Sequence, residues 1–386
     1  MKSAAILTLC FSITCVQSQV LEQCRVAAYP GKANDVIPTE ILNLDLPPLE
    51  RWTNIVTPRK GKILHFVNYV KHLLPFGVFK YLSEALASGI DKIPYPYNDE
   101  IIGIAKALDL PLGDILACNI FYELEKMCTS IILRDPEGYV YHARNMDLGA
   151  WMGWDTKNNT WKLAELLRPI TVNVEFQSKG QTLYKTVQFA GTVGVFTGVK
   201  SGKFSFSLNS RSAEHFFGGP MSVVEWLLVP RSKYQFASLW AREVFDKAES
   251  YHEAKTMLST QPIWAPVYYI LAGVNRNEGI VITRSKTSST HPMILNEKMW
   301  YLVQTNYDNW KNPPFYDNRR KPAKMCLKQL RNASNKLREN SLQILFNILS
   351  TVPVENKATI YTALMSPRNG HLESYKRSCK GICYPW

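Results

Sequence analysis

The sequence predicts a layered α+β domain. Strand-like runs follow one another after residue 128, helical patterns come next, and another pair of strand-like runs follows the helices. Strands that are grouped in this way, rather than alternating singly with helices, favour separate layers of sheet and helix. The chain has 386 residues and 46% hydrophobic content, which is enough to bury a large core.

The first residues have the layout of a cleaved secretory signal. Lys2 is followed by an apolar run from Ala4 to Val16 and then by polar residues. A membrane-spanning anchor is the alternative, but the run is too short for it. We therefore expect residues 1–18 to be removed and the mature chain to enter the secretory pathway.

Before residue 128 the sequence predicts an extended strap followed by helices. Residues 29–58 are polar and rich in proline, which favours extended structure. Apolar residues at helical spacing in 63–90, with a break at Pro75, predict two short amphipathic helices. These helices either lean into lipid or belong to the core, and the two interpretations carry equal weight. Residues 99–117 have helical periodicity with a break at Pro111.

After residue 128 strand patterns dominate. Thr129–Leu133 and Tyr139–Ala143 flank a segment with Pro and Gly where a type I turn requires them, which predicts a hairpin that begins at Cys128. Further strands are expected at 170–176, 182–189, 194–197, 204–208, 267–274 and 279–284, and helices at 221–228 and 238–258.

Charge and cysteine content limit the partners. The net charge is +13, made up of +1 from Lys2, −2 from residues 19–127 and +14 from residues 128–386. Such a basic surface suits anionic lipid or glycan in a secreted protein better than nucleic acid, and a merely soluble basic surface is an equally good interpretation. No Cys-x-x-Cys or histidine-rich spacing indicates a zinc site, so we expect no metal or cofactor. Sequons at Asn158 and Asn332 fit a glycoprotein.

Cys128 stands at the head of the predicted hairpin. A lone cysteine there is usually a small buried apolar residue. Its neighbours change that interpretation, because Arg144 and Asp147 follow the return strand directly and the hairpin brings both beside the thiol. These two charged neighbours favour the interpretation of Cys128 as a nucleophile over that of a core residue.

Several motifs extend the pattern through most of the mature chain. They are Met127-Cys128-Thr129-Ser130-Ile131, Ala143-Arg144-Asn145-Met146-Asp147, Gly153-Trp154, Asn158-Asn159-Thr160-Trp161, Phe189-Ala190-Gly191, Val303-Gln304-Thr305-Asn306-Tyr307-Asp308, Arg319-Arg320-Lys321-Pro322-Ala323-Lys324-Met325-Cys326 and Cys379-Lys380-Gly381-Ile382-Cys383-Tyr384-Pro385-Trp386. Together they resemble the acid ceramidase family of N-terminal nucleophile hydrolases.

The resemblance implies a four-layer αββα fold with a helical N-terminal accessory segment. It also implies a proenzyme that cuts itself between Met127 and Cys128, which leaves residues 19–127 as a small fragment and residues 128–386 as a catalytic one. The cut gives Cys128 a free α-amine, whose unperturbed pKa is about 7.7–8.0, so that one residue supplies nucleophile and base.

The resemblance further implies roles for neighbouring side chains. Asp147 orients the α-amine, and Arg144 supports the thiol and the substrate carbonyl. Asn306 offers its amide to the oxyanion, Arg319 holds the region of Asn306 or Asp147 in place, and Asn209 is a second candidate oxyanion donor. A structural ion pair is the alternative for each charged residue, and a structural role is the serious alternative for Asn209 and Arg319.

Two further expectations concern specificity and disulfides. Where the family pattern reads Asn-Glu-Arg, this chain has Ser210 in place of the Glu, which puts the preference for a sphingoid base in doubt. The expected cut separates Cys24 from Cys326, so a disulfide between them would keep the fragments joined. The remaining pair, Cys379 and Cys383, would close a terminal loop and leave Cys118 buried and free.

The implied function is hydrolysis of ceramide to a sphingoid base and a fatty acid through a thioester on Cys128, in the lysosome and also outside the cell. The implied partners are ceramide or a related N-acyl lipid, an anionic membrane surface and a saposin-like activator. An N-acylethanolamine-hydrolysing acid amidase is the nearest alternative, although residues 153–161 favour ceramide. A lipid-binding protein without turnover is the alternative of another class. A cysteine protease is disfavoured, because no Cys/His pair with family spacing is evident.

Overall fold

The computed structural model describes residues 24–73, 78–124, 127–148, 153–211, 218–229, 233–314, 317–332, 341–379 and 383. The expected signal, residues 1–18, lies outside these ranges.

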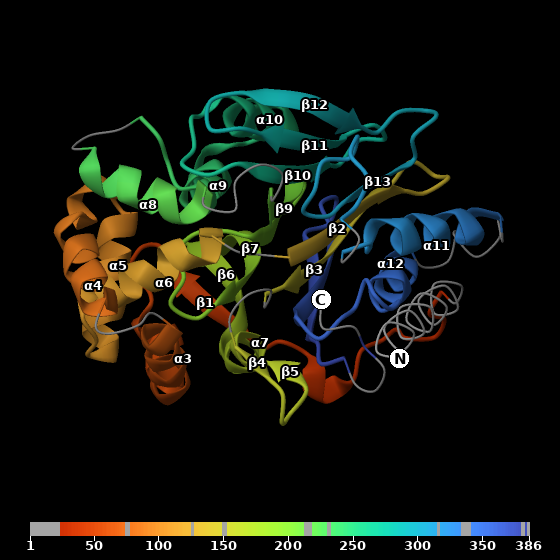
Figure 1. Ribbon diagram of the computed structural model, residues 1–386. Helices are drawn as coiled ribbons and strands as arrows, with labels where there is room; N and C mark the ends of the chain where they lie inside the picture. Colours follow the sequence, from red (N-terminus) through yellow and green to blue (C-terminus); the bar gives the residue numbers. More distant parts are fainter. Residues whose placement is uncertain are drawn as a thin grey trace.

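Two sheets form the centre of the molecule (Figure 1). The first has eight strands, in the order β1 (Thr39–Asn43), β6 (Thr171–Ser178), β7 (Gln181–Phe189), β8 (Thr197–Lys200), β9 (Phe204–Ser210), β10 (Val267–Gly273), β11 (Gly279–Arg284) and β12 (Ser289–Ile294). The second has five strands, in the order β13 (Tyr301–Gln304), β2 (Met127–Arg134), β3 (Val140–Asp147), β14 (Thr359–Ser366) and β15 (His371–Lys376). A small hairpin joins β4 (Trp154–Asp155) to β5 (Thr160–Trp161).

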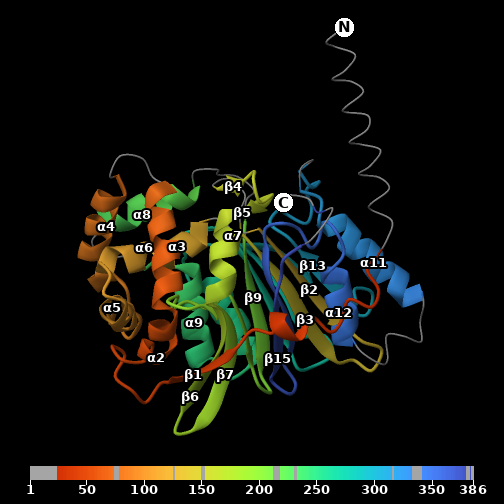
Figure 2. The same ribbon diagram turned by 90° about the horizontal axis from the view of Figure 1, so that it is seen from below.

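Helices cover the outer face of each sheet, so the layers run helix, sheet, sheet, helix. The sheets contact each other through β2 with β9, β3 with β10 and β14 with β8. Helices α11 (Arg320–Asn332) and α12 (Ser341–Leu349) pack on the five-stranded sheet, as Figure 2 shows from below, and α9 (Ala237–Lys247) and α10 (Tyr251–Thr260) lie on the side of the eight-stranded sheet. The predicted αββα arrangement is confirmed.

Of the remaining helices, α3 (Lys60–Leu73), α4 (Val78–Ser88), α5 (Tyr97–Leu108), α6 (Leu112–Leu124) and α8 (Gly218–Leu228) gather at one end of the sheets, whereas α7 (Lys162–Leu167) lies beside the β4–β5 hairpin (Figure 1). The others are α2 (Thr53–Val56) and short 3₁₀ turns at Ala33–Asp35, Thr57–Arg59, Ile90–Lys92 and Arg168–Ile170.

The β2–β3 hairpin is present as predicted, although its return strand continues through Asp147, so Arg144 and Asp147 lie within it and not after it. The alternation of its side chains explains the layers. Ile131 and Leu133 belong to an apolar cluster with α11 and α12, whereas Ile132 belongs to a cluster with residues of β10 and β11. Because successive side chains on a strand point to opposite faces, a continuous apolar run fits a strand that is covered on both sides. The turn is closed by a hydrogen bond from the Gly138 amide to the Asp135 carbonyl, and Gly138 has a φ of 93°.

Three other predicted segments have a different structure, and the elements after Arg284 were not predicted. The expected strap contributes β1, which pairs in parallel with β6. The strand expected at 194–197 begins only at Thr197, because the chain turns at Gly191 and the Val193 amide donates to the side chain of Asn119. The helix expected at 238–258 is two helices, since the Ser250 hydroxyl caps α10 by accepting from the Glu253 amide.

The two helices expected in 63–90 are present as α3 and α4, and their apolar faces are used in the core. The side chains of Ile63, Phe66, Val67, Val70 and Leu86 are buried, while Tyr81 on α4 is 73% exposed. Lipid contact by this region therefore stays a prediction and can rest only on exposed residues. Within the described residues, no helix combines the length and apolar content needed to cross a bilayer.

Candidate active site

The β2–β3 pairing places Cys128 opposite Met146 and next to the pair of Ser130 with Arg144. Residues that face each other across antiparallel strands project to the same side of the sheet. The thiol, Met146 and Arg144 therefore share the inner face, toward the eight-stranded sheet. Asp147 and Thr129 contact Arg319, whose chain leads into α11 on the other side.

Arg144 holds the sulfur of Cys128. Its Nη2 lies 2.6 Å from the Cys128 Sγ, and its Nη1 donates to the Thr197 hydroxyl at 2.8 Å and to the Phe196 carbonyl at 3.0 Å. Cys128 and Arg144 are both fully buried. A guanidinium beside a sulfur stabilises the thiolate, which is the nucleophilic form.

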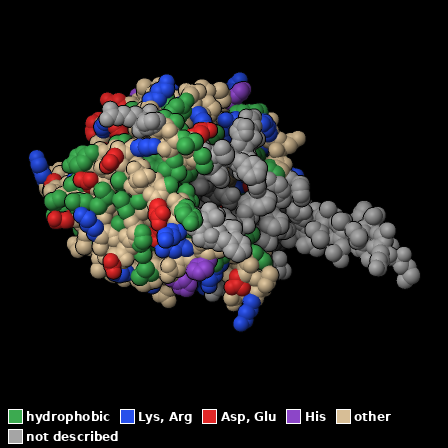
Figure 3. Space-filling view, turned by 60° about the vertical axis from the view of Figure 1, so that its left-hand side comes forward, with side chains coloured by type: hydrophobic (Ala, Val, Ile, Leu, Met, Phe, Trp, Pro, Cys, Tyr) green, Lys and Arg blue, Asp and Glu red, His purple; other side chains and the backbone are tan. Residues whose placement is uncertain are grey.

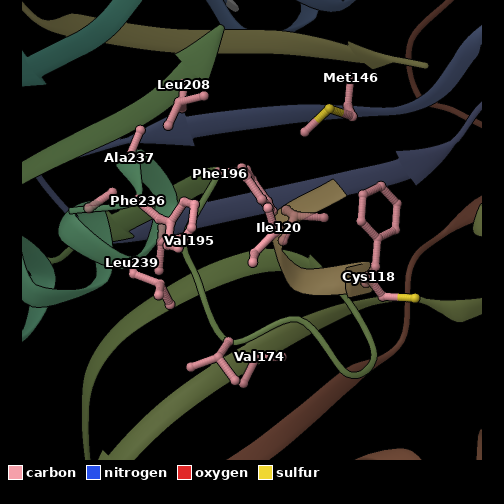
Figure 4. Packing of buried hydrophobic residues seen from close by; sticks show 14 of the residues in the cluster. Cys118, Ile120, Met146, Val174, Val195, Phe196, Leu208, Phe236, Ala237 and Leu239 are labelled. Carbon is pink, nitrogen blue, oxygen red and sulfur yellow. The ribbon is translucent and has the colours of Figure 1, made fainter. Parts of the chain in front are cut away.

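The sulfur also adjoins the main apolar core. Its Sγ lies 3.9 Å from the Sδ of Met146, and both residues belong to the largest hydrophobic cluster. Figure 4 shows Met146, Phe196, Leu208 and Ile120 around the same apolar interior. The environment of the Cys128 thiol is therefore polar on the side of Arg144 and apolar on the side of Met146.

Asn306 holds the backbone nitrogen of Cys128, the atom that would become the α-amine. The nitrogen donates to the Asn306 Oδ1 at 2.6 Å, and Arg319 donates to the same oxygen at 2.9 Å. Two donors on this oxygen fix the orientation of the amide. The Nδ2 of Asn306, which the family resemblance assigns to the oxyanion, donates to the Ser210 carbonyl at 2.9 Å in the uncut chain.

Asp147 is buried and shares the cation of Arg319. The Nη1 of Arg319 donates to the Asp147 Oδ2 at 2.9 Å, and the Asn356 amide lies 3.4 Å from the same oxygen. Burial raises the pKa of Asp147 to about 6, although the positive charge of Arg319 opposes the rise. Among the described groups, the Asp147 Oδ1 has no hydrogen-bond partner. The carboxylate thus has an acceptor atom to spare beside the cysteine strand.

Arg319 joins several parts of the site, including a carboxylate that sequence reasoning missed. Its Nε and Nη2 donate to both oxygens of Asp317 at 2.6 and 2.8 Å. The attraction of Asp317 and Asp147 raises the pKa of Arg319 against the effect of burial, so it stays cationic. Asp317 stands two residues before Arg319 in the sequence, and this short spacing was the signal that could have indicated the ion pair. The other missed residues, Asn356, Thr197 and Tyr361, gave none because they come from distant strands and loops.

Asn209 makes contacts that support its structural alternative. Its Nδ2 donates to the carbonyls of Gln304 and Thr305, and its Oδ1 accepts from the Ser130 hydroxyl. The side chain thus ties β9 to β2 and to the segment that leads to Asn306. A role as oxyanion donor remains an untested prediction for Asn209.

The cysteines and sequons are placed as follows. Disulfides join Cys24 to Cys326 and Cys379 to Cys383, as expected. Cys118 is buried and free, and burial raises the pKa of its thiol to about 12. Asn158 is exposed in the turn between β4 and β5, where its Nδ2 donates to Asp155.

One predicted glycosylation site falls partly beyond the described residues. Asn332 ends α11, and its side chain and the rest of its sequon lie outside the described residues. No group of three or more His, Cys, Asp or Glu side chains suited to a metal occurs in the described part of the chain.

Comparison with known proteins identifies the family. A family described as "Linear amide C-N hydrolases, choloylglycine hydrolase family" matches residues 128–378. The acid ceramidase of Balaenoptera acutorostrata scammoni is 41% identical over 97% of this chain and 96% of its own length. That of Homo sapiens is 39% identical over 99% of this chain and 98% of its own. The chain belongs to the acid ceramidase family.

Two further similarities concern a related amidase. A model described as "beta subunit of N-acylethanolamine-hydrolyzing acid amidase" matches residues 35–93. A solved structure of the Caenorhabditis elegans N-acylethanolamine-hydrolyzing acid amidase ortholog has a TM-score of 0.51 and 32% sequence identity, and the match covers 62% of this chain and 93% of that one. The expected family and fold class are confirmed, and membership of the acid ceramidase family makes this chain an amidohydrolase.

Proposed function

We propose that this protein is a self-cleaving lysosomal amidase that hydrolyses ceramide to a sphingoid base and a fatty acid. The arrangement at Cys128 carries this proposal. The sulfur of Cys128 contacts the guanidinium of Arg144, and its backbone nitrogen donates to the side chain of Asn306. The carboxylate of Asp147 is held close by through Arg319. The acid ceramidases to which the chain is similar over nearly its full length supply the substrate.

Hydrolysis proceeds through a thioester. The α-amine of Cys128 takes the thiol proton, and the sulfur attacks the amide carbonyl of the lipid. Collapse of the tetrahedral intermediate breaks the carbon–nitrogen bond, and the leaving amine takes the proton from the α-ammonium group. Water then attacks the thioester and releases the fatty acid and the thiol. The Nδ2 of Asn306 carries two hydrogens, so it can donate one to the oxyanion while the other still donates to the Ser210 carbonyl.

Cleavage between Met127 and Cys128 would create that α-amine. The family match that begins at residue 128 supports this boundary. The disulfide between Cys24 and Cys326 spans the two expected fragments. The cut would thus free an amine without releasing the small fragment.

A second substrate class has its own support. The similarity to an N-acylethanolamine-hydrolyzing acid amidase covers both expected fragments, since one match lies in 35–93 and the structural match is broader. Ser210 also lacks the carboxylate that the ceramidase pattern leads us to expect at this position. An N-acylethanolamine is therefore the alternative substrate.

Contact with an anionic membrane completes the proposal. The end of α4 abuts α8, because Gly89 lies against the ring of Trp226. On this side of the molecule Tyr81, Leu228 and Val229 are exposed, and Figure 3 shows apolar side chains interspersed with Lys and Arg as well as with Asp and Glu. Exposed apolar groups and basic residues together suit an anionic lipid surface. A saposin-like activator is a further proposed partner, and export from the cell is a second proposed destination.

The test compares two lipids with the same acyl chain. Purified protein is incubated at acidic pH with ceramide or with the N-acylethanolamine, and fatty acid release is measured for wild type and for Cys128→Ala. Higher kcat/KM on ceramide supports the main proposal, and higher kcat/KM on the N-acylethanolamine replaces it with the alternative. Binding of ceramide without release of fatty acid by either protein would favour a lipid-binding protein on this fold.

A further inference from the structure

Arg144 lies on the five-stranded sheet, and its guanidinium is held against the Cys128 sulfur by contacts with the eight-stranded sheet. The side chain is fully buried, and its Nη1 donates to the Thr197 hydroxyl and the Phe196 carbonyl, both at the start of β8. A long flexible side chain is held in one geometry by its acceptors, so these two oxygens, together with the Leu208 carbonyl 3.3 Å from Nη2, determine where Nη2 lies. That nitrogen is the one placed on the Cys128 sulfur.

Thr197 is itself held by Tyr361. The two hydroxyl oxygens lie 2.8 Å apart and join β8 of the eight-stranded sheet to β14 of the five-stranded sheet. Tyr361 is fully buried, and its ring makes an edge contact with Phe189 at a centroid distance of 6.2 Å. Its position is therefore fixed by packing as well as by the hydrogen bond.

Tyr361 is also in register with the nucleophile. It pairs with Met146 across β14 and β3, and Met146 pairs with Cys128 across β3 and β2. The three side chains form a row on the inner face of the five-stranded sheet. The centre of the Arg144 guanidinium lies 5.9 Å from the Tyr361 ring. The hydroxyl that fixes Thr197 thus stands on the same row as the thiol.

We propose that Tyr361 and Thr197 are positioning residues that hold the Arg144 guanidinium against the sulfur of Cys128. Neither side chain is required to touch the substrate. They act by fixing the distance between a cation and the sulfur, and so the fraction of thiol present as nucleophilic thiolate. The inference rests on the proposed use of Cys128 as nucleophile, and it extends it by two residues that no motif indicated.

The neighbouring charges are consistent with a fixed, non-titrating pair. Burial raises the pKa of Tyr361, so the phenol stays protonated in the working pH range. His142 lies on the same face as Arg144, and burial together with Arg144 lowers the pKa of His142 to about 3, so it stays neutral. Asp147 and Arg319 lie on the other side of the strand. Arg144 is therefore the cation on the sulfur side.

The test separates the hydroxyl groups from the packing. Thr197→Val and Tyr361→Phe remove one oxygen each with nearly the same shape, whereas Thr197→Ser keeps the oxygen. Tyr269→Phe is the matched control, because Tyr269 is an equally buried tyrosine whose hydroxyl donates to the Ala237 carbonyl. The measurements on cleaved enzyme are kcat, KM and the rate of iodoacetamide labelling of Cys128 against pH, read by peptide mass spectrometry.

Loss of either oxygen is expected to lower kcat about tenfold, with KM within about twofold, because one hydrogen bond of ordinary net strength corresponds to about that factor. Labelling at acidic pH falls by a similar factor and its pH profile moves to higher pH. Thr197→Ser and Tyr269→Phe retain wild-type labelling. The double variant Thr197→Val with Tyr361→Phe is no slower than the worse single variant, because both act through one chain of contacts.

Unchanged kcat and labelling in both oxygen-deleted variants would overturn the inference, as would equal losses in Tyr269→Phe. If Tyr361→Phe does not fold, the comparison of Thr197→Ser with Thr197→Val decides. Failure of the proposed function is seen separately, as a wild-type enzyme that releases fatty acid from neither lipid while the labelling differences persist.

Discussion

Cys128 on β2 lies between two arginines whose own contacts differ: Arg144 on the side of its sulfur and Arg319 on the side of its backbone nitrogen. On the sulfur side, Arg144 donates only to uncharged oxygens and to sulfur atoms in the described structure, and its Nε has no partner. On the amine side, Arg319 is shared by the carboxylates of Asp147 and Asp317. The first cation keeps its charge available to a developing anion, whereas the charge of the second is locally balanced and serves to hold neighbours in place.

The largest expected effect follows from the residue that both sides share. Cys128→Ala removes the proposed nucleophile and the expected cut, so self-cleavage and amide hydrolysis are expected to fall by at least about a thousandfold. The check is a gel assay for the two fragments with a fatty acid release assay. Cys118→Ala is the control, because that thiol is buried elsewhere in the core. Equal loss in both variants would place the nucleophile elsewhere or indicate misfolding.

The comparison itself is tested by removing each cation in an uncut Cys128→Ala background. Arg319→Gln leaves two buried carboxylates without their cation and is expected to lower the free energy of unfolding by about 3–5 kcal/mol. Arg144→Gln leaves no hydrogen-bonded carboxylate behind and costs about 1–2 kcal/mol. Urea unfolding measures both. Equal losses would mean that Arg144 is a structural cation like Arg319.

A smaller effect concerns pH and Asp147. Its folded-state pKa of about 6 lies above the ordinary value of 3.8, so between these values the folded chain retains a proton that the unfolded chain has lost. This contribution to stability is complete below about pH 4 and is lost as pH rises through 6. In the Cys128→Ala background, unfolding free energy should therefore fall over this window relative to Cys128→Ala with Asp147→Asn. A constant difference from pH 4 to 7 would contradict the raised pKa.

The smallest expected effect is a shift in the pH range over which protonation of Asp147 changes the unfolding free energy. Asp317 draws on the same guanidinium as Asp147. Asp317→Asn leaves the charge of Arg319 to Asp147 alone, which lowers the pKa of Asp147 and moves the window to lower pH. The same unfolding series measures the shift. Glu243→Gln, which removes a carboxylate from an exposed pair with Lys247, should leave the window unchanged.

Sequence patterns predicted the parts of the fold that depend on local order. The apolar runs on β2 and β10 and the turn at Gly138 are visible in the sequence and are present in the structure. The break between α9 and α10 was missed, although Ser250 followed by Glu253 is a capping signal, because the apolar periodicity continues across it. Pairing between distant strands, such as β1 with β6, which are far apart in the sequence, leaves no local pattern in the sequence.

The site divides in the same way. Cys128, Arg144 and Asp147 lie on one hairpin, so their proximity follows from strand pairing alone. Asn306 and Arg319 come from distant segments and could be connected to them only through the family resemblance. Their partners, such as Asn356 and Tyr361, depend on contacts between layers, which sequence periodicity does not encode.

The most direct test of the central claim is the identity of the N-terminus in active material. Purified protein is incubated at acidic pH, and its fragments are sequenced by mass spectrometry before and after reduction, alongside the activity. The account predicts a large fragment that begins at Cys128 and stays joined to the small fragment through Cys24 and Cys326 until reduction. Full activity in chains that remain uncut, or a new N-terminus at another residue, would contradict it.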